Sequence, residues 1–340
     1  MAAVGSTTCA HRGTRVTLVH PGAPRSRSGN RVTALRWACI LRGLGCSVRV
    51  ERTWSGAACD ILIAIHAAKT LDAIRRAQDH GPDLRIVVAC AGTDIYGENA
   101  PTPETLEGIQ AAFRVVVLQP LALDALPPAV RPRARVIYQS VVLPQALFDS
   151  SHVDDPTPDL SVAVVANVRP VKDPLTVVRA TERLPASSRL VIQQAGAAID
   201  AGLARQLEDR ARNNPRYSYL GELGHRAALE LVARSRLLVL SSRHEGGANV
   251  LSEALAMGVP VLCTDIPGNA GLLGKDYAGL FPVGDAATLA HLLERFETDS
   301  TYRSRLRAQV QARAWIAQRS GETKAWSDLL DELASPDAPD

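Results

Sequence analysis

The chain has 340 residues, of which 46% are hydrophobic and 21% charged, and its formal net charge at pH 7 is +3. This length allows two domains that each bury a core, and no apolar stretch approaches the roughly 20 residues of a membrane-spanning helix. Residues 1–150 hold the basic excess, 17 Lys and Arg against 11 Asp and Glu, and only 4% of the chain is aromatic. Because no basic stripe is interleaved with aromatic side chains, we expect no nucleic-acid partner and no membrane association.

The amino terminus and the cysteines indicate the cellular compartment. Residues 1–13 lack the apolar core of a secretion signal, so we expect a disordered leader there. The six cysteines form no C-x-x-C pair. This favours reduced thiols in a cytoplasmic protein without a zinc site.

Short apolar runs alternate with helical patterns in the first half of the chain. We expect strands at residues 16–19, 48–50, 61–65, 86–89 and 115–118, and the clearest helices at 30–44 and 70–79. This alternation predicts a parallel sheet with helices on both faces. Residues 14–150 form this first Rossmann-like domain, and residues 151–160, rich in Ser, Asp and Pro, read as a linker.

The same alternation returns after the linker. We expect strands at residues 162–166, 190–193, 217–220, 237–240 and 261–262, which define a second doubly wound domain over 161–305. Residues 306–335 have helical spacing with Trp315 and Trp326 but no further strand, and we expect these helices to cross back onto the first domain. Ligands of such sheets bind at the carboxyl ends of the strands, so we expect a binding cleft between the two domains.

Residues 241–255 carry the most informative motif. Glu245 and Glu253 stand eight residues apart around Gly246 and Gly247, directly after an apolar strand, and helical spacing begins at Asn249. A helix that begins at the carboxyl end of a strand offers free N–H groups and a positive dipole end to a diphosphate. Two carboxylates can accept hydrogen bonds from the hydroxyls of a sugar and a ribose. The motif therefore predicts a nucleotide-sugar site.

This order of strand, loop and helix, followed by an apolar strand and a second glycine-bearing loop at residues 264–271, resembles the large retaining glycosyltransferase family four, of the group 1 type. The resemblance implies the GT-B fold, an α/β architecture of two doubly wound Rossmann-like domains with a cleft between them. It also implies that residues 161–305 bind a UDP-sugar, with Glu245 at the donor sugar and Glu253 at the ribose.

The resemblance extends to the turn after the first strand of the second domain. Lys172 matches a lysine that neutralises the donor diphosphate, but Asn167 occupies the position of the usual arginine. Either Arg169 replaces that charge from a shifted register, or the leaving group is stabilised with one cation fewer. The residues expected at the donor are Glu253, Gly246, Gly247, Asn249, Gly268 and Gly221. No Asp-x-Asp motif accompanies them, so we expect no metal.

An anion site is predicted in the first domain. Within residues 20–31, three arginines, two serines and Gly29 stand at the start of a helix, where N–H groups, hydroxyls and guanidinium groups converge. The expected acceptor-binding residues are Arg25, Arg27, Ser28, Gly29, Asn30, Arg31, Lys69 and Thr93. His66 and Asp94 follow two further strands and complete the expected catalytic set of Glu245, Lys172, Arg169, His66 and Asp94.

Residues 26–37, 92–96, 118–121, 169–174 and 241–250 together resemble one subfamily, the selenosugar synthases of selenoneine biosynthesis. That resemblance implies UDP-N-acetylglucosamine or UDP-glucose as donor, selenophosphate as acceptor, and a 1-selenosugar, UDP and phosphate as products, without a cofactor. The selenium of selenophosphate is already anionic, so positioning and charge neutralisation suffice for its attack. His66 or Asp94 would assist the later loss of phosphate.

Three other functions fit the same donor motif. An ordinary glycosyltransferase acting on a hydroxyl acceptor would keep every donor residue but would need a base such as Asp94. A UDP-sugar 2-epimerase would turn over the donor without an acceptor. A non-catalytic nucleotide-sugar sensor would bind UDP-sugar through Glu245 and Glu253 and never release UDP.

Overall fold

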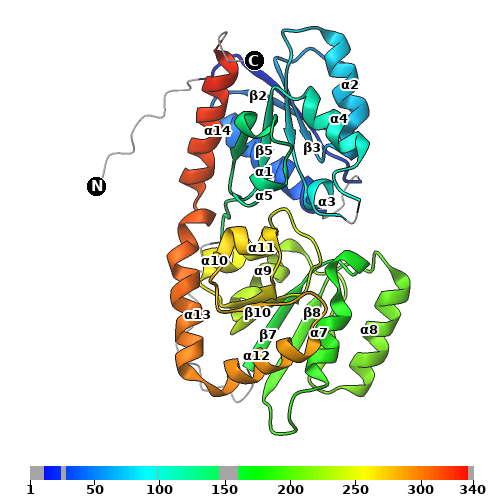
Figure 1. The fold of residues 1–340 in the computed structure, drawn as a ribbon, viewed down its shortest axis with the longest axis vertical. Coiled ribbons are helices and arrows are strands. Elements are labelled where there is room, and N and C mark those ends of the chain that lie inside the picture. The colour runs from blue at the N-terminus through cyan, green and yellow to red at the C-terminus, as the bar shows by residue number, and fades with distance from the viewer. Residues whose placement is uncertain (1–10, 24–27, 98, 145–159, 336–340) are drawn as a thin grey trace. The chain divides into compact units, whose positions relative to one another are not determined.

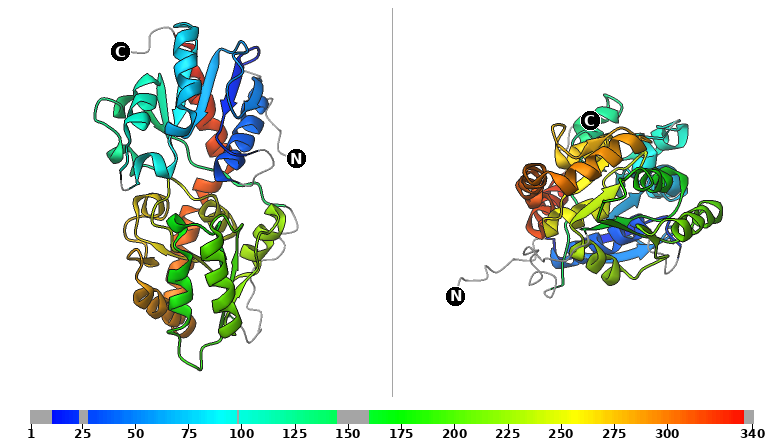
Figure 2. Two further views of the ribbon diagram at one scale, coloured as in Figure 1. Left: turned by 90° about the vertical axis from the view of Figure 1, so that its right-hand side faces the viewer. Right: turned by 90° about the horizontal axis from the view of Figure 1, so that it is seen from below.

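The computed structural model describes residues 11–23, 28–97, 99–144 and 160–335 (Figures 1 and 2). They divide into two compact units, one ending at Gln139 and resuming at Arg319, the other running from Ser140 to Gln318. The division therefore falls before the boundary expected at residue 150. The leader expected at residues 1–13 lies largely outside the described residues, as does most of the linker at 151–160.

The first unit contains a six-stranded parallel sheet in the order β2-β1-β3-β4-β5-β6. The strands are β1 (Arg15–Val19), β2 (Ser47–Glu51), β3 (Ile61–Ile65), β4 (Arg85–Ala89), β5 (Arg114–Val117) and β6 (Ala134–Val136). All five residues of β3 are buried, as expected of a central strand with helices on both faces. The five strands expected from the apolar runs are confirmed.

Helices cover both faces of this sheet. They are α1 (Gly29–Gly43), α2 (Leu71–His80), α3 (Gly92–Ile95), α4 (Pro103–Ala111), α5 (Ala122–Ala125) and α14 (Arg319–Ala334), with 3₁₀ turns η1 (Ala68–Thr70) and η2 (Arg131–Arg133). One core cluster holds side chains of α1 and α14. The other holds side chains of α2 and α4 on the opposite face.

Helix α14 is part of the first unit although it follows the second in sequence (Figure 1). The ring of Trp326 packs edge-on against Trp37 of α1, with 4.8 Å between centroids. Glu322, 1% exposed, accepts hydrogen bonds from Trp37 Nε1 at 2.8 Å and Arg36 Nε at 3.1 Å. These long-range contacts make α14 a component of the core of the first unit.

The second unit contains another six-stranded parallel sheet, in the order β12-β11-β10-β7-β8-β9. The strands are β7 (Leu160–Val165), β8 (Leu190–Ala195), β9 (Tyr217–Tyr219), β10 (Leu237–Leu240), β11 (Val261–Thr264) and β12 (Leu280–Phe281). The five expected strands are confirmed. The sixth, β12, has two residues and therefore shows no periodicity along the sequence.

The helices of the second unit alternate with these strands. They are α7 (Pro174–Thr181), α8 (Ala201–Asn213), α9 (His225–Arg234), α10 (Asn249–Met257), α11 (Pro267–Leu273), α12 (Ala286–Thr298) and α13 (Ser300–Arg313), with 3₁₀ turns η3 (Pro170–Lys172) and η4 (Ala314–Ala317). Helix α10 ends at Gly258, whose φ of +69° lies in the left-handed region that glycine adopts at little cost. Helix α13 remains with the second unit, so of the helices expected over 306–335 only α14 joins the first.

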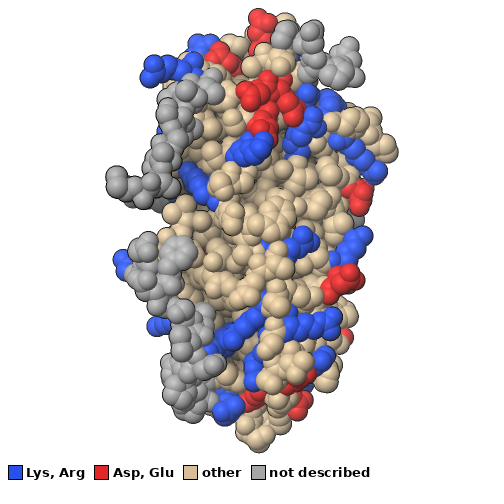
Figure 3. Space-filling model, turned by 90° about the vertical axis from the view of Figure 1, so that its left-hand side faces the viewer, with Lys and Arg blue, Asp and Glu red and all other residues tan. Residues whose placement is uncertain are grey.

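No helix among the described residues is both long and apolar enough to cross a membrane. On the face shown in Figure 3, Lys and Arg side chains are interspersed with uncharged surface and do not form a single patch. In each sheet, loops at the carboxyl ends of the strands carry the residues that the sequence singles out.

Candidate functional site

The loop after β10 carries Glu245 into a buried position. Strand β10 is apolar throughout and ends at Leu240, after which Ser241 and Ser242 are also buried. Glu245 is 9% exposed, and Ser242 Oγ donates a hydrogen bond to its Oε1 at 2.7 Å. Helix α10 then begins at Asn249, so its amino terminus lies close in sequence to this carboxylate.

Lys172 comes from the turn η3, after β7, and forms an ion pair with Glu245 Oε1. The turn is tied to the loop after β10, because Arg243 N donates to Val171 O at 2.8 Å. Ser241 Oγ lies 3.0 Å from Lys172 O and 2.9 Å from Asp173 O, within hydrogen-bonding distance of both. Two segments far apart in sequence therefore hold one cation and one carboxylate together.

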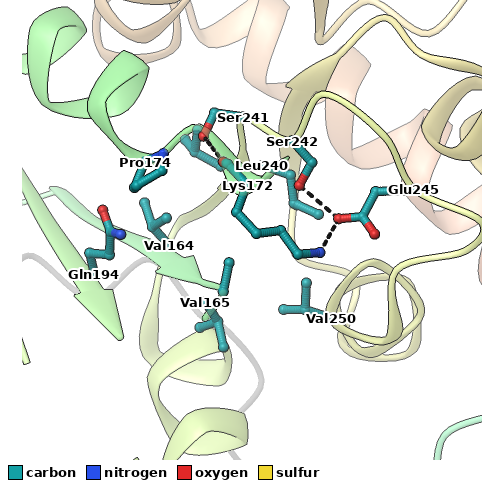
Figure 4. Close-up of a pocket in the computed structure, with 12 residues that line it drawn as sticks. Val164, Val165, Lys172, Pro174, Gln194, Leu240, Ser241, Ser242, Glu245 and Val250 are labelled. Carbon is teal, nitrogen blue, oxygen red and sulfur yellow. Dashed lines mark hydrogen bonds and ion pairs between the residues drawn. The ribbon is translucent and has the colours of Figure 1, made fainter. Parts of the chain in front are cut away.

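Lys172, Ser241, Ser242 and Glu245 line a pocket in the second unit (Figure 4). Val164, Val165, Leu240 and Val250 supply apolar walls, and Lys172, Ser241, Ser242 and Glu245 supply the polar groups. Apolar walls with a few convergent polar groups are typical of small-molecule sites. The pocket lies at the carboxyl ends of β7 and β10, which are neighbours in the sheet.

Glu253, the second carboxylate of the motif, lies in the second turn of α10 and is 8% exposed. His225 Nδ1, at the start of α9, is 4.0 Å from Glu253 Oε1, and burial lowers the pKa of His225. Gly221 precedes α9 and has a φ of +69°. Its carbonyl accepts a hydrogen bond from Gly196 N at 2.8 Å, which links the loops after β8 and β9.

Gly268 packs directly against the loop that holds Glu245. A Cβ at position 268 would overlap the carbonyl of Glu245 and lie 2.8 Å from the Cβ of that residue. The lack of a side chain therefore allows α11 to approach the Glu245 loop. Gly246 and Gly247 are not among the described glycines with positive φ, so the turn before α10 does not use a left-handed glycine.

Arg169 and Asn167 have different positions in the loop after β7. Arg169 is exposed, and it is not among the described residues that line the pocket. Asn167, at the position where an arginine was expected, accepts a hydrogen bond from Ala197 N through Oδ1 at 3.2 Å. This side chain therefore fixes the neighbouring loop after β8.

Gln194 is a pocket residue that sequence reasoning missed. It lies on β8 and is 1% exposed, and its Oε1 accepts a hydrogen bond from Tyr217 OH at 2.8 Å. Its Nε2 is buried and has no hydrogen-bond partner among the described residues. Ser241 and Ser242 lie within the motif at residues 241–255, but the sequence pattern predicts no role for them. The sequence does contain a signal for Gln194, because it is a polar residue in a strand whose other positions are mostly apolar.

His66 and Asp94 meet in the first unit, at the carboxyl ends of β3 and β4. His66 has a φ of 78°, in the left-handed region, and its Nδ1 lies 2.7 Å from Asp94 Oδ1, though not aligned as a hydrogen bond. Thr93 Oγ1 is 3.1 Å from His66 Nε2. Asp94 is fully buried and accepts hydrogen bonds from Ala67 N and Ala91 N at 3.0 and 2.8 Å. Backbone N–H groups therefore hold Asp94, and His66 lies directly beside it.

The predicted anion site lies partly within the described residues. Arg25 and Arg27 lie outside them, whereas Ser28 precedes α1 and Gly29, Asn30 and Arg31 begin it. His20, which follows β1 and was not predicted, is 5% exposed. Burial lowers its pKa, and the positive charges of Arg31 and Arg52 lower it further. Arg31 and Arg52 therefore place positive charge near His20 at the end of β1.

Lys69 is exposed in η1, and Thr93 is exposed at the start of α3. Among the described residues, no group of three His, Cys, Asp or Glu side chains is placed to hold a metal ion.

Residues 150–313 match a protein-family model described as "Glycosyl transferases group 1". Over 83 residues the chain is 34% identical to TuaC of Bacillus subtilis (strain 168), named as a teichuronic acid biosynthesis glycosyltransferase, covering 24% of this chain and 21% of TuaC. Over 121 residues it is 28% identical to glycosyltransferase 1 domain-containing protein 1 of Xenopus tropicalis, covering 34% of each chain. The aligned regions thus span 21% and 34% of these curated relatives.

Solved structures match nearly the whole chain. Sucrose-phosphate synthase from Thermosynechococcus elongatus superposes with a TM-score of 0.76 at 15% identity, covering 94% of this chain and 99% of that chain. HepE from Anabaena, solved with UDP and glucose, superposes with a TM-score of 0.71 at 14% identity and the same coverage. At these identities the likeness establishes the fold, and the expected GT-B fold is confirmed.

Proposed function

We propose that this chain, a GT-B protein whose residues 150–313 match the group 1 glycosyl transferase family model, transfers a hexosyl group from a UDP-sugar. The contact between Lys172 and Glu245 in one pocket, beside the start of α10, carries this proposal. A cation and a helix amino terminus suit a diphosphate, and a buried carboxylate suits the hydroxyls of a sugar. The similar fold of HepE, which holds UDP and glucose, supports it.

Each donor residue has a distinct role in this proposal. Lys172 and the first N–H groups of α10 neutralise the charge that develops on the leaving UDP. Glu245 orients the sugar, and Glu253 accepts hydrogen bonds from the ribose. Arg169, exposed beside the Lys172 turn, adds a second cation once the diphosphate is bound. Gly268 contributes by allowing the Glu245 loop its close packing.

The proposed acceptor is selenophosphate, held by Arg25, Arg27 and Arg31 with the start of α1. Burial is the main cause of the lowered pKa of His20, and the positive charges of Arg31 and Arg52 add to it. These two cations beside the end of β1 support an anion site there. Anionic selenium attacks the anomeric carbon, the bond from that carbon to the diphosphate oxygen breaks, and UDP leaves. Water then attacks phosphorus, the selenium–phosphorus bond breaks, and a 1-selenosugar and phosphate remain.

A hydroxyl acceptor is the second candidate, and the contact between His66 and Asp94 favours it. A hydroxyl must lose a proton as it attacks, and a histidine paired with a carboxylate is a suitable base. Asp94 is fully buried and accepts hydrogen bonds from backbone N–H groups, so in this candidate His66 Nε2 takes the proton. This differs from the sequence-based expectation that Asp94 itself would be the base.

One experiment separates these functions. The protein is mixed with UDP-N-acetylglucosamine or UDP-glucose together with selenophosphate, with a hydroxyl compound, or with neither, and both UDP release and product masses are recorded. Selenophosphate-dependent release of UDP with a hexosyl selenol mass supports the proposed acceptor. Release that requires a hydroxyl compound instead supports the second candidate. Binding without release of UDP under any condition contradicts transfer and supports a sensor.

A further inference from the structure

The ion pair of Lys172 and Glu245 joins two side chains that contact different parts of the donor in the proposed function. Lys172 serves the diphosphate and Glu245 serves the sugar. Their side chains are 16% and 10% exposed. Each of these two charges is therefore balanced by the other (Figure 4).

The apolar surroundings of the Lys172–Glu245 ion pair raise the free-energy cost of separating it. Val164, Val165 and Val250 line the pocket around it. Apolar surroundings strengthen charge interactions and raise the cost of a charge left unpaired. Ser242 Oγ donates a hydrogen bond to Glu245 Oε1, but a neutral hydroxyl cannot replace the cation.

Any ligand that carries a diphosphate competes with Glu245 for the ammonium group of Lys172. UDP alone draws Lys172 toward its phosphates and leaves the carboxylate of Glu245 without a cation. A UDP-sugar brings hydroxyl groups that donate hydrogen bonds to the same carboxylate. Separation of the ion pair therefore lowers the affinity for UDP. For the intact donor, the hydrogen bonds from the sugar hydroxyls to Glu245 offset this cost.

We infer that Glu245 makes this site select the intact nucleotide sugar over UDP, because it competes with the diphosphate for Lys172. The inference rests on the proposed function and assigns Glu245 a second role within it. Once the transferred sugar has left the site, its hydroxyl groups no longer donate hydrogen bonds to Glu245, and Lys172 returns to Glu245. The same competition therefore promotes release of the product UDP.

Calorimetric titration of the full chain with UDP, UDP-glucose and UDP-N-acetylglucosamine, without acceptor, tests this selectivity. Glu245→Gln should bind UDP about tenfold more tightly than the wild type, and its preference for UDP-sugar over UDP should fall by a similar factor. The matched control is Glu230→Gln, which removes an acidic partner 2.9 Å from Arg226 on the exposed side of α9. This control should bind both ligands like the wild type.

A second set of variants tests whether Lys172 mediates the effect. In a Lys172→Met background, adding Glu245→Gln should no longer tighten UDP binding, because no cation remains to be released. Glu245→Ala serves as a second variant, with folding of each protein checked by circular dichroism. A folded Glu245 variant with unchanged or weaker UDP binding overturns the inference, as does equal tightening in the Lys172→Met background. A wild-type chain that binds neither UDP nor UDP-sugar overturns the proposed function, and the inference with it.

Discussion

His66 and Asp173 are the described non-glycine residues with left-handed backbone, with φ of 78° and 42°. This conformation costs such residues on the order of 1–3 kcal/mol and persists where surrounding contacts impose it. His66 N donates to Ala89 O at 2.8 Å, and the carbonyl of Asp173 accepts from Ser241 Oγ at 2.9 Å. His66 lies beside Asp94, and Asp173 directly follows the pocket residue Lys172. Backbone strain of this kind is typical of sites where side chains must be held in a fixed orientation.

His66→Asn separates the two candidate acceptors. Asparagine tolerates left-handed backbone, so the fold should persist while the imidazole is lost. With a hydroxyl acceptor, the loss of a general base should lower kcat by about 10²- to 10⁴-fold. UDP release driven by selenophosphate should stay within about threefold of the wild type, because that nucleophile needs no base.

Steady-state kinetics of UDP release with each acceptor provide the measurement. His80→Asn, at the exposed carboxyl end of α2, is the control and should match the wild type. An equal fall in kcat with both acceptors would contradict the role of His66 as a general base needed only for a hydroxyl acceptor.

Among the elements, α11 and the loop after β10 depend on each other. Gly268, in the first turn of α11, packs against the carbonyl of Glu245, and Asn269 of the same helix donates to Thr264 O at 2.9 Å. Thr264 Oγ1 in turn donates to Ser242 O at 2.5 Å. The position of Glu245 therefore depends on an element that contributes no charged group to the pocket.

Gly268→Ala should displace the Glu245 loop, because the added Cβ meets backbone that cannot move alone. We expect a destabilisation of about 1–3 kcal/mol and weaker UDP-sugar binding. Gly321→Ala is the control, since a Cβ there meets nothing within 4 Å and alanine favours the α14 helix. Thermal unfolding and calorimetric titration measure the two effects, and wild-type values for Gly268→Ala would contradict this packing argument.

For the whole molecule, the main feature is that the first unit is completed by the last helix of the chain. Trp326, Leu329, Leu330 and Leu333 of α14 are each at most 4% exposed. Each such side chain contributes about 1.5–3 kcal/mol when buried. Their sum is comparable to the 5–15 kcal/mol that stabilises a typical domain.

Truncation after Gln318 should therefore leave the first unit unfolded or partly folded. Near-ultraviolet circular dichroism and limited proteolysis should report the loss, with cleavage in residues 11–139. Truncation after Ser335, which keeps α14, is the matched control and should preserve both signals. A cooperative transition of unchanged Tm after removal of α14 would contradict this view of the fold.

Glu332 makes the attachment of α14 depend on pH. Burial raises the pKa of Glu332, but hydrogen bonds from Arg135 and Arg114 outweigh this and hold it below the ordinary value of 4.5. Because the folded-state pKa is depressed, the stabilisation is fully present above the ordinary value and is lost as pH falls through the folded value. Glu332→Gln should lower Tm at pH 7 and reduce the fall in Tm between about pH 5 and pH 3. An unchanged slope would show that the ion pair adds no pH-dependent stability.

The fold and the donor motif could be predicted from the sequence because both depend on local signals. Strand and helix periodicity extends over a few residues, and residues 241–255 contain a strand end, a carboxylate and a helix start in succession. The two-residue β12 and the short helix α3 carried no comparable signal.

Contacts between distant residues required the three-dimensional arrangement. Lys172 and Glu245 are 73 residues apart, and His66 and Asp94 pair across neighbouring strand ends. Sequence spacing does not reveal which polar groups the ends of parallel strands bring within 3 Å. It also does not show that backbone N–H groups donate hydrogen bonds to the carboxylate of Asp94. Burial and hydrogen-bond satisfaction are properties of the packed chain, because they depend on what every other segment places around a group.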